Sequence, residues 1–312
     1  MRTDFYYESQ CGSRIHGCRW IPAGEVKAIV QFVHGISERM ERYGEFAEYL
    51  NSQGILVVGE DHMGHGLSVT EKTPKCYFSG GWMGAVADTY QLTKDTMEKH
   101  PGVPYFIYGH SMGSFMTRTL LAKYPDSGIT GAIICGTGWQ SPVIITAAKA
   151  LAEIISKIKG EKYPSKFLRK LAFGSYNNKI KPVRTALDWL TRDQKSVDAY
   201  IADPLCGGTA TAGLMRDMMD GFAYIQDEKN LNAMNKELPV FFIAGDADPV
   251  GEYGKGVLHT AEIFRKAGMK QVDVKLYPQA RHEIHNELNK DEVYDDVQNW
   301  IVQVTEKVKS TV

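Results

Sequence analysis

Short apolar runs rich in β-branched and aromatic residues recur along the chain, and most are followed by glycine or polar residues. Nearly continuous apolar runs of this kind are typical of strands that are buried on both faces. The predicted strands cover residues 26–33, 54–59, 105–108, 131–135, 238–244 and 272–277. Helical patterns lie between or after them, at residues 43–53, 86–99, 115–124, 254–267 and 291–309. This alternation predicts βαβ units, and therefore an α/β fold with a mostly parallel central sheet flanked by helices.

Two segments depart from this alternation. Residues 1–20 alternate around Gly12 and Ser13, which predicts an antiparallel hairpin at the edge of the sheet. Between Trp139 and Lys236 the strand pattern stops and helical patterns replace it. We therefore expect a core formed by residues 1–138 and 237–312, interrupted by a helical cap segment at residues 139–236.

The predicted cap segment starts with a helix at residues 143–158 that is apolar over most of its surface and needs a partner. Residues 149–184 hold ten Lys or Arg against two acidic residues, a net charge of +8. This basic stretch is either a solvated face or a surface for weak peripheral contact with anionic lipid or with substrate head groups. A stripe with Met215, Met218 and Met219 either fills a core or lines an acyl pocket.

The overall charge is balanced, with 36 Lys and Arg against 37 Asp and Glu among 312 residues. Binding to a phosphate backbone needs a basic surface, so we expect no nucleic acid partner. No apolar segment reaches the roughly 20 residues of a spanning helix, and the N-terminus lacks an apolar signal core. We therefore expect a cytoplasmic protein. Five scattered cysteines without a CxxC pair predict reduced, mostly buried thiols.

The strongest chemical signal is Gly109-His110-Ser111-Met112-Gly113, a G-x-S-x-G between a predicted strand and a predicted helix. A sharp turn of this kind holds a serine in strained backbone geometry with its hydroxyl exposed. Glycines two residues to either side are needed because a Cβ there would collide with neighbouring backbone. The context favours a nucleophile elbow over a structural turn and makes Ser111 the predicted nucleophile.

A serine hydroxyl needs a base that takes its proton and an acid that orients this base. Asp248 follows the predicted strand at 238–244, and His282 follows the strand at 272–277. Both therefore lie at the carboxyl ends of parallel strands, where such sheets place their sites. The order Ser111, Asp248, His282 is that of an α/β-hydrolase triad.

Each partner has a competitor nearby. Asp246 competes with Asp248, which is favoured because Pro249 suits a turn directly after it. His285 competes with His282, which is favoured because it comes first after its strand, whereas His285 fits the start of the final helical region.

A tetrahedral intermediate also needs donors for its oxyanion. One donor is expected to be the backbone N–H of Met112, which follows the nucleophile at a helix N-terminus. The second is expected to be the N–H of Ile36, in the loop after the strand at 26–33. In the same loop His34 is expected to stabilise the backbone by a hydrogen bond.

No metal or cofactor is predicted. The sequence His282-Glu283-Ile284-His285 lacks the H-E-x-x-H spacing of a zinc helix. Residues 61–66 hold two histidines and an aspartate, but their two glycines indicate tight turns in which polar side chains bond nearby backbone.

These motifs resemble the α/β-hydrolase superfamily and, within it, the monoglyceride lipase and lysophospholipase-like group that is catalogued with serine aminopeptidases. The resemblance rests on His34-Gly35 with Glu38 and Arg42-Tyr43, on residues 61–68, 109–113 and 245–248, and on His282-Glu283 with Glu287. It implies that Ser111 is the nucleophile, His282 the general base and Asp248 its orienter, with the amides of Ile36 and Met112 as oxyanion hole. It also implies a cap that closes the site.

The expected function is a serine hydrolase that cleaves carboxylic esters through an acyl-enzyme intermediate, without a cofactor. The apolar cap segment with its basic first part favours a lipid-like substrate such as a monoacylglycerol or a lysophospholipid. One alternative is a serine aminopeptidase or amidase, whose acidic pocket would come from Asp217, Asp220 or Asp227. A second is a small-ester esterase, and a third is a hydrolase-like protein that binds a ligand without turnover.

Overall fold

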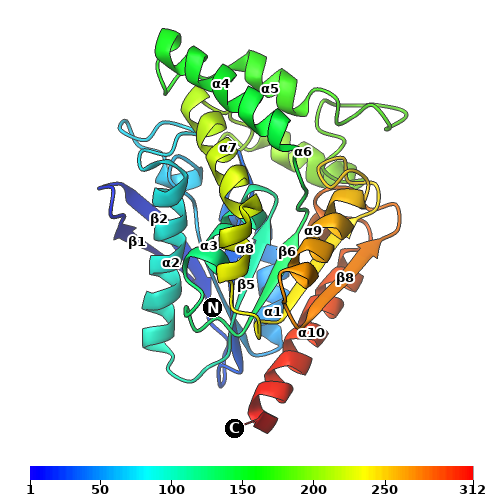
Figure 1. The fold of residues 1–312 in the computed structure, drawn as a ribbon. Coiled ribbons are helices and arrows are strands. Elements are labelled where there is room, and N and C mark those ends of the chain that lie inside the picture. Colours follow the sequence, from blue (N-terminus) through cyan, green and yellow to red (C-terminus); the bar gives the residue numbers. More distant parts are fainter. Residues whose placement is uncertain (312) are drawn as a thin grey trace.

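The computed structural model describes residues 1–311 and is built around one eight-stranded sheet (Figure 1). The strands are β1 (Arg2–Glu8), β2 (Arg14–Trp20), β3 (Ala28–Val33), β4 (Ile55–Glu60), β5 (Tyr105–His110), β6 (Gly131–Cys135), β7 (Val240–Gly245) and β8 (Val272–Tyr277). Their order is β1-β2-β4-β3-β5-β6-β7-β8. Strands β3 to β8 run parallel, whereas β2 pairs antiparallel with both β1 and β4. The predicted parallel sheet and edge hairpin are both present.

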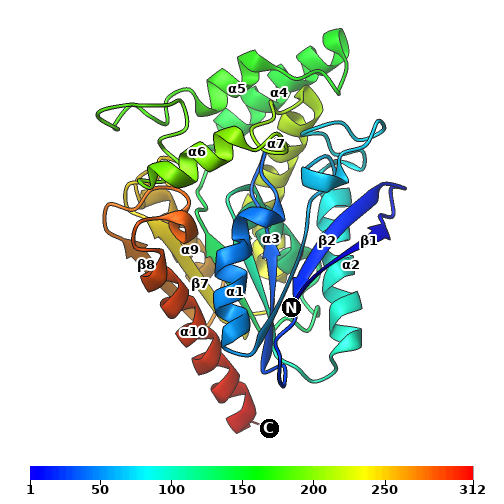
Figure 2. The same cartoon turned by 180° about the vertical axis from the view of Figure 1, so that it is seen from behind.

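Helices cover both faces of this sheet, as Figures 1 and 2 show from opposite sides. One face packs against α1 (Gly44–Ser52) and α10 (Lys290–Thr311), and the other against α2 (Gly81–Lys99), α3 (Met112–Lys123) and α9 (Lys255–Lys266). The central strands β3 and β5 are buried along their whole length. This double burial explains why they read as nearly continuous apolar runs.

Two helices begin earlier than the sequence pattern predicts. Helix α2 starts at Gly81 rather than at residue 86, and α3 starts at Met112 rather than at residue 115. Glycines near both starts disfavour a helix by their intrinsic propensity. Packing overrides this propensity, because Trp82 and Met112 are both almost fully buried.

The cap segment, residues 139–236 between β6 and β7, is helical. Its helices are α4 (Pro142–Lys159), α5 (Lys166–Phe173), α6 (Gln194–Ala202), α7 (Ala212–Gln226) and α8 (Glu228–Ala233). Helix α7 packs on α2 and α3, with the rings of Phe222 and Phe115 4.5 Å apart. Met215, Met218 and Met219 are buried in this contact, so the methionine stripe fills the core.

Helix α4 finds its expected partner in α7, yet part of its apolar surface stays exposed. Ile145 and Ala152 are buried, whereas Val143, Ile144 and Ile158 are each more than half exposed. Within residues 1–311, no helix is both long enough and apolar enough to cross a membrane.

The turn from β5 into α3 depends on glycine at position 113. A Cβ at Gly113 would overlap the carbonyl oxygen of Val33 and lie 2.7 Å from that of His34. Because this obstacle is backbone of β3 and its loop, Gly113→Ala is expected to lower the free energy of unfolding by about 3 kcal/mol or more. Urea denaturation measures this loss.

Gly44→Ala is the matched control for this substitution. Gly44 has right-handed helical geometry (φ −55°, ψ −48°), and no atom lies within 4 Å of its added Cβ. This variant is expected to match the wild type or to be up to about 1 kcal/mol more stable. Equal losses in the two variants would contradict the steric argument.

Candidate active site

Ser111 forms the sharp turn between β5 and α3. Its backbone has φ 54° and ψ −122°, in the region that strains a residue with a Cβ. The Ser111 N–H donates to the carbonyl of Cys135 on the neighbouring strand β6 at 3.0 Å. A Cβ at Gly109 would overlap Thr117 and the carbonyl of Gly113. The structure therefore has the strained strand-to-helix turn that the motif predicts.

Asp248 and His282 lie side by side in the loops after β7 and β8. The Nδ1 atom of His282 is 2.9 Å from Oδ2 of Asp248, and both side chains are almost fully buried. The other carboxylate oxygen of Asp248 accepts the N–H of Val250 at 2.8 Å. The Nε2 atom of His282 has no hydrogen-bond partner within residues 1–311. With Nδ1–H donated to Asp248, this second nitrogen is available to accept a proton.

The competing residues make other contacts. Asp246 accepts the N–H of Gln279 at 2.6 Å, which fixes the turn after β8. His285 lies in the short 3-10 helix η3 (Ile284–Asn286), before the final helix, and stacks on Tyr43 with ring centroids 4.5 Å apart. The structure thus brings the favoured pair together and leaves both competitors outside it.

Burial and the charge of Asp248 shift the pKa of His282 in opposite directions. Burial by itself lowers the pKa of an imidazole, because the charged form loses water. The negative charge and the hydrogen bond of Asp248 outweigh burial and raise the pKa of His282 above its ordinary value. Asp248 thereby stabilises the protonated imidazole, which is the form that a general base reaches after it accepts a proton.

The loop after β3 approaches Ser111 closely. A Cβ at Gly35 would lie 3.0 Å from the Cβ of Ser111 and 2.5 Å from a carboxylate oxygen of Glu38, so glycine permits this approach. Among the described residues, neither the N–H of Ile36 nor that of Met112 donates a hydrogen bond. Both groups therefore have the free donor that an oxyanion site requires.

His34 stabilises the backbone of this loop, as expected. Its Nδ1 atom lies 2.7 Å from the carbonyl of Gly35, and its Nε2 atom accepts the N–H of His62 at 2.9 Å. Complete burial lowers the pKa of His34 to about 3, so the imidazole is neutral. It donates one hydrogen bond and accepts another.

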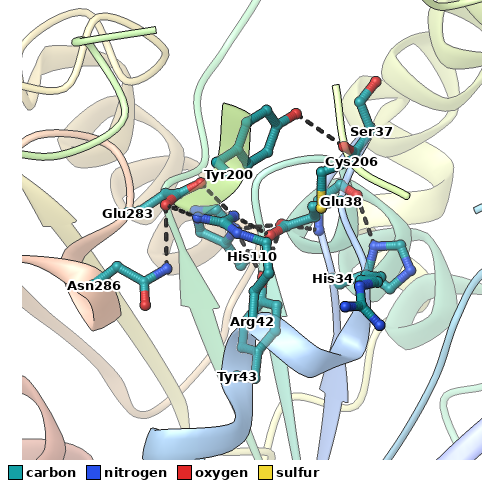
Figure 3. Close-up of polar contacts among 12 residues, drawn as sticks. His34, Ser37, Glu38, Arg42, Tyr43, His110, Tyr200, Cys206, Glu283 and Asn286 are labelled. Atoms are coloured by element: carbon teal, nitrogen blue, oxygen red, sulfur yellow. Dashed lines mark hydrogen bonds and ion pairs between the residues drawn. The ribbon is translucent and has the colours of Figure 1, made fainter. Parts of the chain in front are cut away.

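A buried arginine joins three separate segments beneath the site (Figure 3). Arg42 donates to Glu38 at 2.6 Å and to both carboxylate oxygens of Glu283 at 2.6 and 2.5 Å. Its guanidinium also lies 4.7 Å from the ring of Tyr200 in the cap segment. Burial alone raises the pKa of Glu38, but the His110 hydrogen bond and the charge of Arg42 hold this pKa well below its ordinary value.

The site opens into a cavity of about 410 Å³ between the sheet and the cap segment. Its lining includes Ile36, Ser111 and His282 from the loops after the strands, and Phe173, Trp189 and Tyr200 from the cap segment. The Trp189 ring lies 5.1 Å from that of His282, and the carbonyl of Leu190 accepts the N–H of Glu283 at 2.7 Å. The cap segment therefore both covers the site and holds the His282 loop.

The acidic residues of the cap segment do not form the pocket that an aminopeptidase would need. Asp217 is paired with Arg216, Asp220 with Lys149, and Asp227 accepts N–H groups at the start of α8. None of the three acids lines the cavity, and neither does the methionine stripe of α7.

One group of side chains within residues 1–311 has ligand atoms close enough to hold a metal ion. His110, Cys135 and His285 have ligand atoms within 4.8 Å of one another. Burial raises the pKa of the Cys135 thiol and opposes the thiolate that a soft metal requires. The Nδ1 atom of His110 is already 3.0 Å from the hydroxyl of Tyr43. We assign this group to packing behind the Ser111 turn.

Comparison with known proteins finds relatives that match most of this chain. Residues 24–289 match the family described as Hydrolase_4: Serine aminopeptidase, S33. The monoacylglycerol lipase of Mycolicibacterium smegmatis is 27% identical over 307 residues, 96% of this chain and 97% of that protein. The human monoglyceride lipase is 26% identical over 292 residues, 92% of this chain and 87% of that protein. The crystal structure of a thermostable carboxyl esterase from Bacillus coagulans superposes with a TM-score of 0.87 at 28% identity, covering 97% and 99% of the two chains.

The chain belongs to the serine aminopeptidase S33 family. This assignment and the structural match confirm the predicted α/β-hydrolase fold and the predicted resemblance to the monoglyceride lipase group. They also confirm that the protein is an enzyme of the carboxylic ester hydrolase class.

Sequence reasoning missed several residues that shape the site. From the cap segment, Trp189 contacts His282 and Tyr200 contacts Arg42. One side of α5 also lines the cavity. Trp189 is 93 residues from His282 along the chain, and Tyr200 is 158 residues from Arg42. Neither periodicity nor a local motif reports a contact over such separations.

The contact between Asp248 and His282 predicts how the imidazole titrates. In Asp248→Asn the charge and the hydrogen bond of this carboxylate are lost while burial and the charges of Glu283 and Glu38 remain, so the pKa of His282 is expected to fall below that of the wild type. In the wild type this pKa lies above its ordinary value. An NMR titration of the imidazole carbon and proton resonances measures the pKa of His282 in the wild type and in the variant. Asp246→Asn is the control and is expected to leave the titration unchanged; a reversed response of the two variants would reassign the acid.

The Arg42 contacts predict a large effect on stability. Arg42→Ala leaves the buried carboxylates of Glu38 and Glu283 without their cation, which is expected to cost about 3 to 5 kcal/mol of unfolding free energy. Chemical denaturation measures this change. The control is Arg184→Ala, which removes an exposed pair with Asp198 and is expected to cost less than about 1 kcal/mol. A loss in Arg42→Ala as small as that in the control would contradict the claim that the buried carboxylates of Glu38 and Glu283 need this cation.

Proposed function

We propose that this protein hydrolyses carboxylic esters of the monoacylglycerol type through an acyl-enzyme formed on Ser111. The observation that carries the proposal is that Ser111, in its strained turn, and His282, bonded to Asp248, line one cavity. A nucleophile, a base with a free nitrogen and an acid that orients this base are the parts that acyl transfer from an ester requires.

In the proposed reaction His282 takes the proton of Ser111 through Nε2 while the serine oxygen attacks the ester carbonyl. The N–H groups of Ile36 and Met112 bind the oxyanion of the tetrahedral intermediate. The intermediate collapses when the carbon–oxygen bond to the alcohol breaks, and His282 gives its proton to the leaving alcohol. Water then attacks the acyl-enzyme with the same base, which releases the acid and restores Ser111.

Activity is expected to fall when the pH drops below the raised pKa of His282, because a protonated imidazole cannot accept the serine proton.

Two features support a lipid-like ester as the substrate. The cavity walls carry apolar side chains, among them Ile36, Phe173 and Leu187, which suit an acyl chain. The relatives from Mycolicibacterium smegmatis and human are a monoacylglycerol lipase and a monoglyceride lipase, and the carboxyl esterase from Bacillus coagulans was solved in complex with glycerol.

The aminopeptidase alternative has less support from the cavity. A free amino group of a peptide needs an acidic partner, yet the two carboxylates at the cavity, Glu38 and Glu283, both contact Arg42. A small-ester esterase differs only in how long an acyl chain the cavity accepts. A chain-length series of p-nitrophenyl esters separates that alternative from the lipase.

Ser111→Ala tests the nucleophile. The variant is expected to lose at least about a thousandfold in kcat with p-nitrophenyl butyrate and with monoacylglycerol, because it lacks the hydroxyl that forms the acyl-enzyme in the proposed reaction. It is also expected to resist labelling by a fluorophosphonate. Ser52→Ala changes an exposed serine of α1 and is the control, with wild-type turnover and labelling. Turnover by a folded Ser111→Ala protein at the wild-type rate would contradict the proposal.

A further inference from the structure

Helix α5 of the cap segment turns one charged face into the cavity that Ser111 lines. Lys166, Arg169, Lys170 and Phe173 all line the cavity, at spacings of three and four residues that place them on one side of a helix. Between these positions, Phe167 and Leu171 are about 60% exposed on another side of the helix. The cavity therefore has three cations along one wall, with an aromatic ring at the end of the row.

No acidic side chain within the described part of the chain forms an ion pair with these three cations. None of Lys166, Arg169 and Lys170 forms an ion pair within residues 1–311, whereas Lys149 and Arg184, from the same basic stretch, pair with Asp220 and Asp198. Lys166 and Lys170 are moreover a like-charge pair four residues apart, which destabilises an isolated helix. Lys170 lies in the last turn, where a cation favours the helix, but its repulsion from Lys166 opposes this gain.

The acidic residues at the cavity do not neutralise the cations. Glu38 and Glu283 are the carboxylates in its lining, and both hydrogen-bond to the buried guanidinium of Arg42. Glu38 also accepts the N–H of Gly35 at 2.6 Å and the hydroxyl of Tyr43 at 2.9 Å. Together with Arg42 these two carboxylates keep one net negative charge, against three positive charges on Lys166, Arg169 and Lys170, so the cavity keeps a positive field along the α5 wall.

We propose that the cavity selects esters that carry an anionic group, a phosphate or a carboxylate, in addition to the ester that is cleaved. Lys166 and Lys170 contribute point charges, and the planar fork of Arg169 matches the paired oxygens of either anion. This inference rests on the proposed function, and it adds to ester hydrolysis a preference for esters with an anionic head or tail over neutral glycerol esters. Lys166, Arg169 and Lys170 then determine specificity while Ser111 performs the chemistry.

Short-chain substrates test this selection without a lipid surface. The first pair is 1-butyryl-glycerol and 1-butyryl-glycerol 3-phosphate, which places the anion on the alcohol side. The second pair is p-nitrophenyl butyrate and mono-p-nitrophenyl glutarate, which places it on the acyl side. In at least one pair, kcat/KM of the anionic ester is expected to exceed that of the neutral ester about tenfold at low salt, with the ratio shrinking as salt rises.

A charge-neutral triple variant tests whether α5 is responsible. In K166Q/R169Q/K170Q the anionic-to-neutral ratio is expected to fall to about one. The matched control is K157Q/K159Q/K195Q, which removes the same charge from cap-segment residues that do not line the cavity. The control is expected to keep the wild-type ratio.

The outcomes separate this inference from the proposed function. Wild-type enzyme that cleaves both members of each pair equally well, or prefers the neutral ester, overturns the anionic selection but leaves ester hydrolysis by Ser111 standing. Hydrolysis of none of the four esters contradicts the proposed function itself. An equal loss of the ratio in the control triple variant overturns the inference, because the charge then acts through the whole protein and not through α5.

Discussion

The active site depends on one buried ion cluster. Arg42 binds Glu38, which holds the Gly35 loop, and Glu283, which is adjacent to His282 in the chain. Three buried charges have lost their hydration, so each must keep its partners within hydrogen-bond distance. This requirement fixes the loop after β3 relative to the loop after β8.

A second constraint is that burial and Asp248 act in opposite directions on the charged form of His282. The imidazole is enclosed by the Trp189 ring and by the protein interior, which disfavours its charged form, while Asp248 favours that form. The proposed general base must be neutral before the reaction and charged during it, so both influences bear on that role. Burial and the carboxylate together allow both states within one site.

The cap segment both packs on the core and lines the cavity. Helix α7 shares the apolar core with α2 and α3, and α5 adds Leu168 to the same core. Another side of α5 and the segment around Trp189 line the cavity. The charge on α5 therefore lies at the cavity without contributing to the packing of the core.

Local sequence determined much of this protein. Doubly buried strands are mostly apolar, so β3, β5 and β7 were recognisable, and the glycines around Ser111 indicated the sharp turn after β5. Because the carboxyl ends of parallel strands share one edge, Asp248 and His282 were predictable as partners, and the order of the motifs carried the resemblance to the family.

Only the tertiary structure decided which charges reach the cavity. The sequence shows ten basic residues in one stretch but not that Lys166, Arg169 and Lys170 line the site while Lys149 and Arg184 are paired elsewhere. The same holds for Arg42, whose partner Glu283 lies 241 residues away. Hydrophobic periodicity records which face of an element is buried, whereas contacts between distant segments depend on how whole elements pack, and no local pattern encodes this packing.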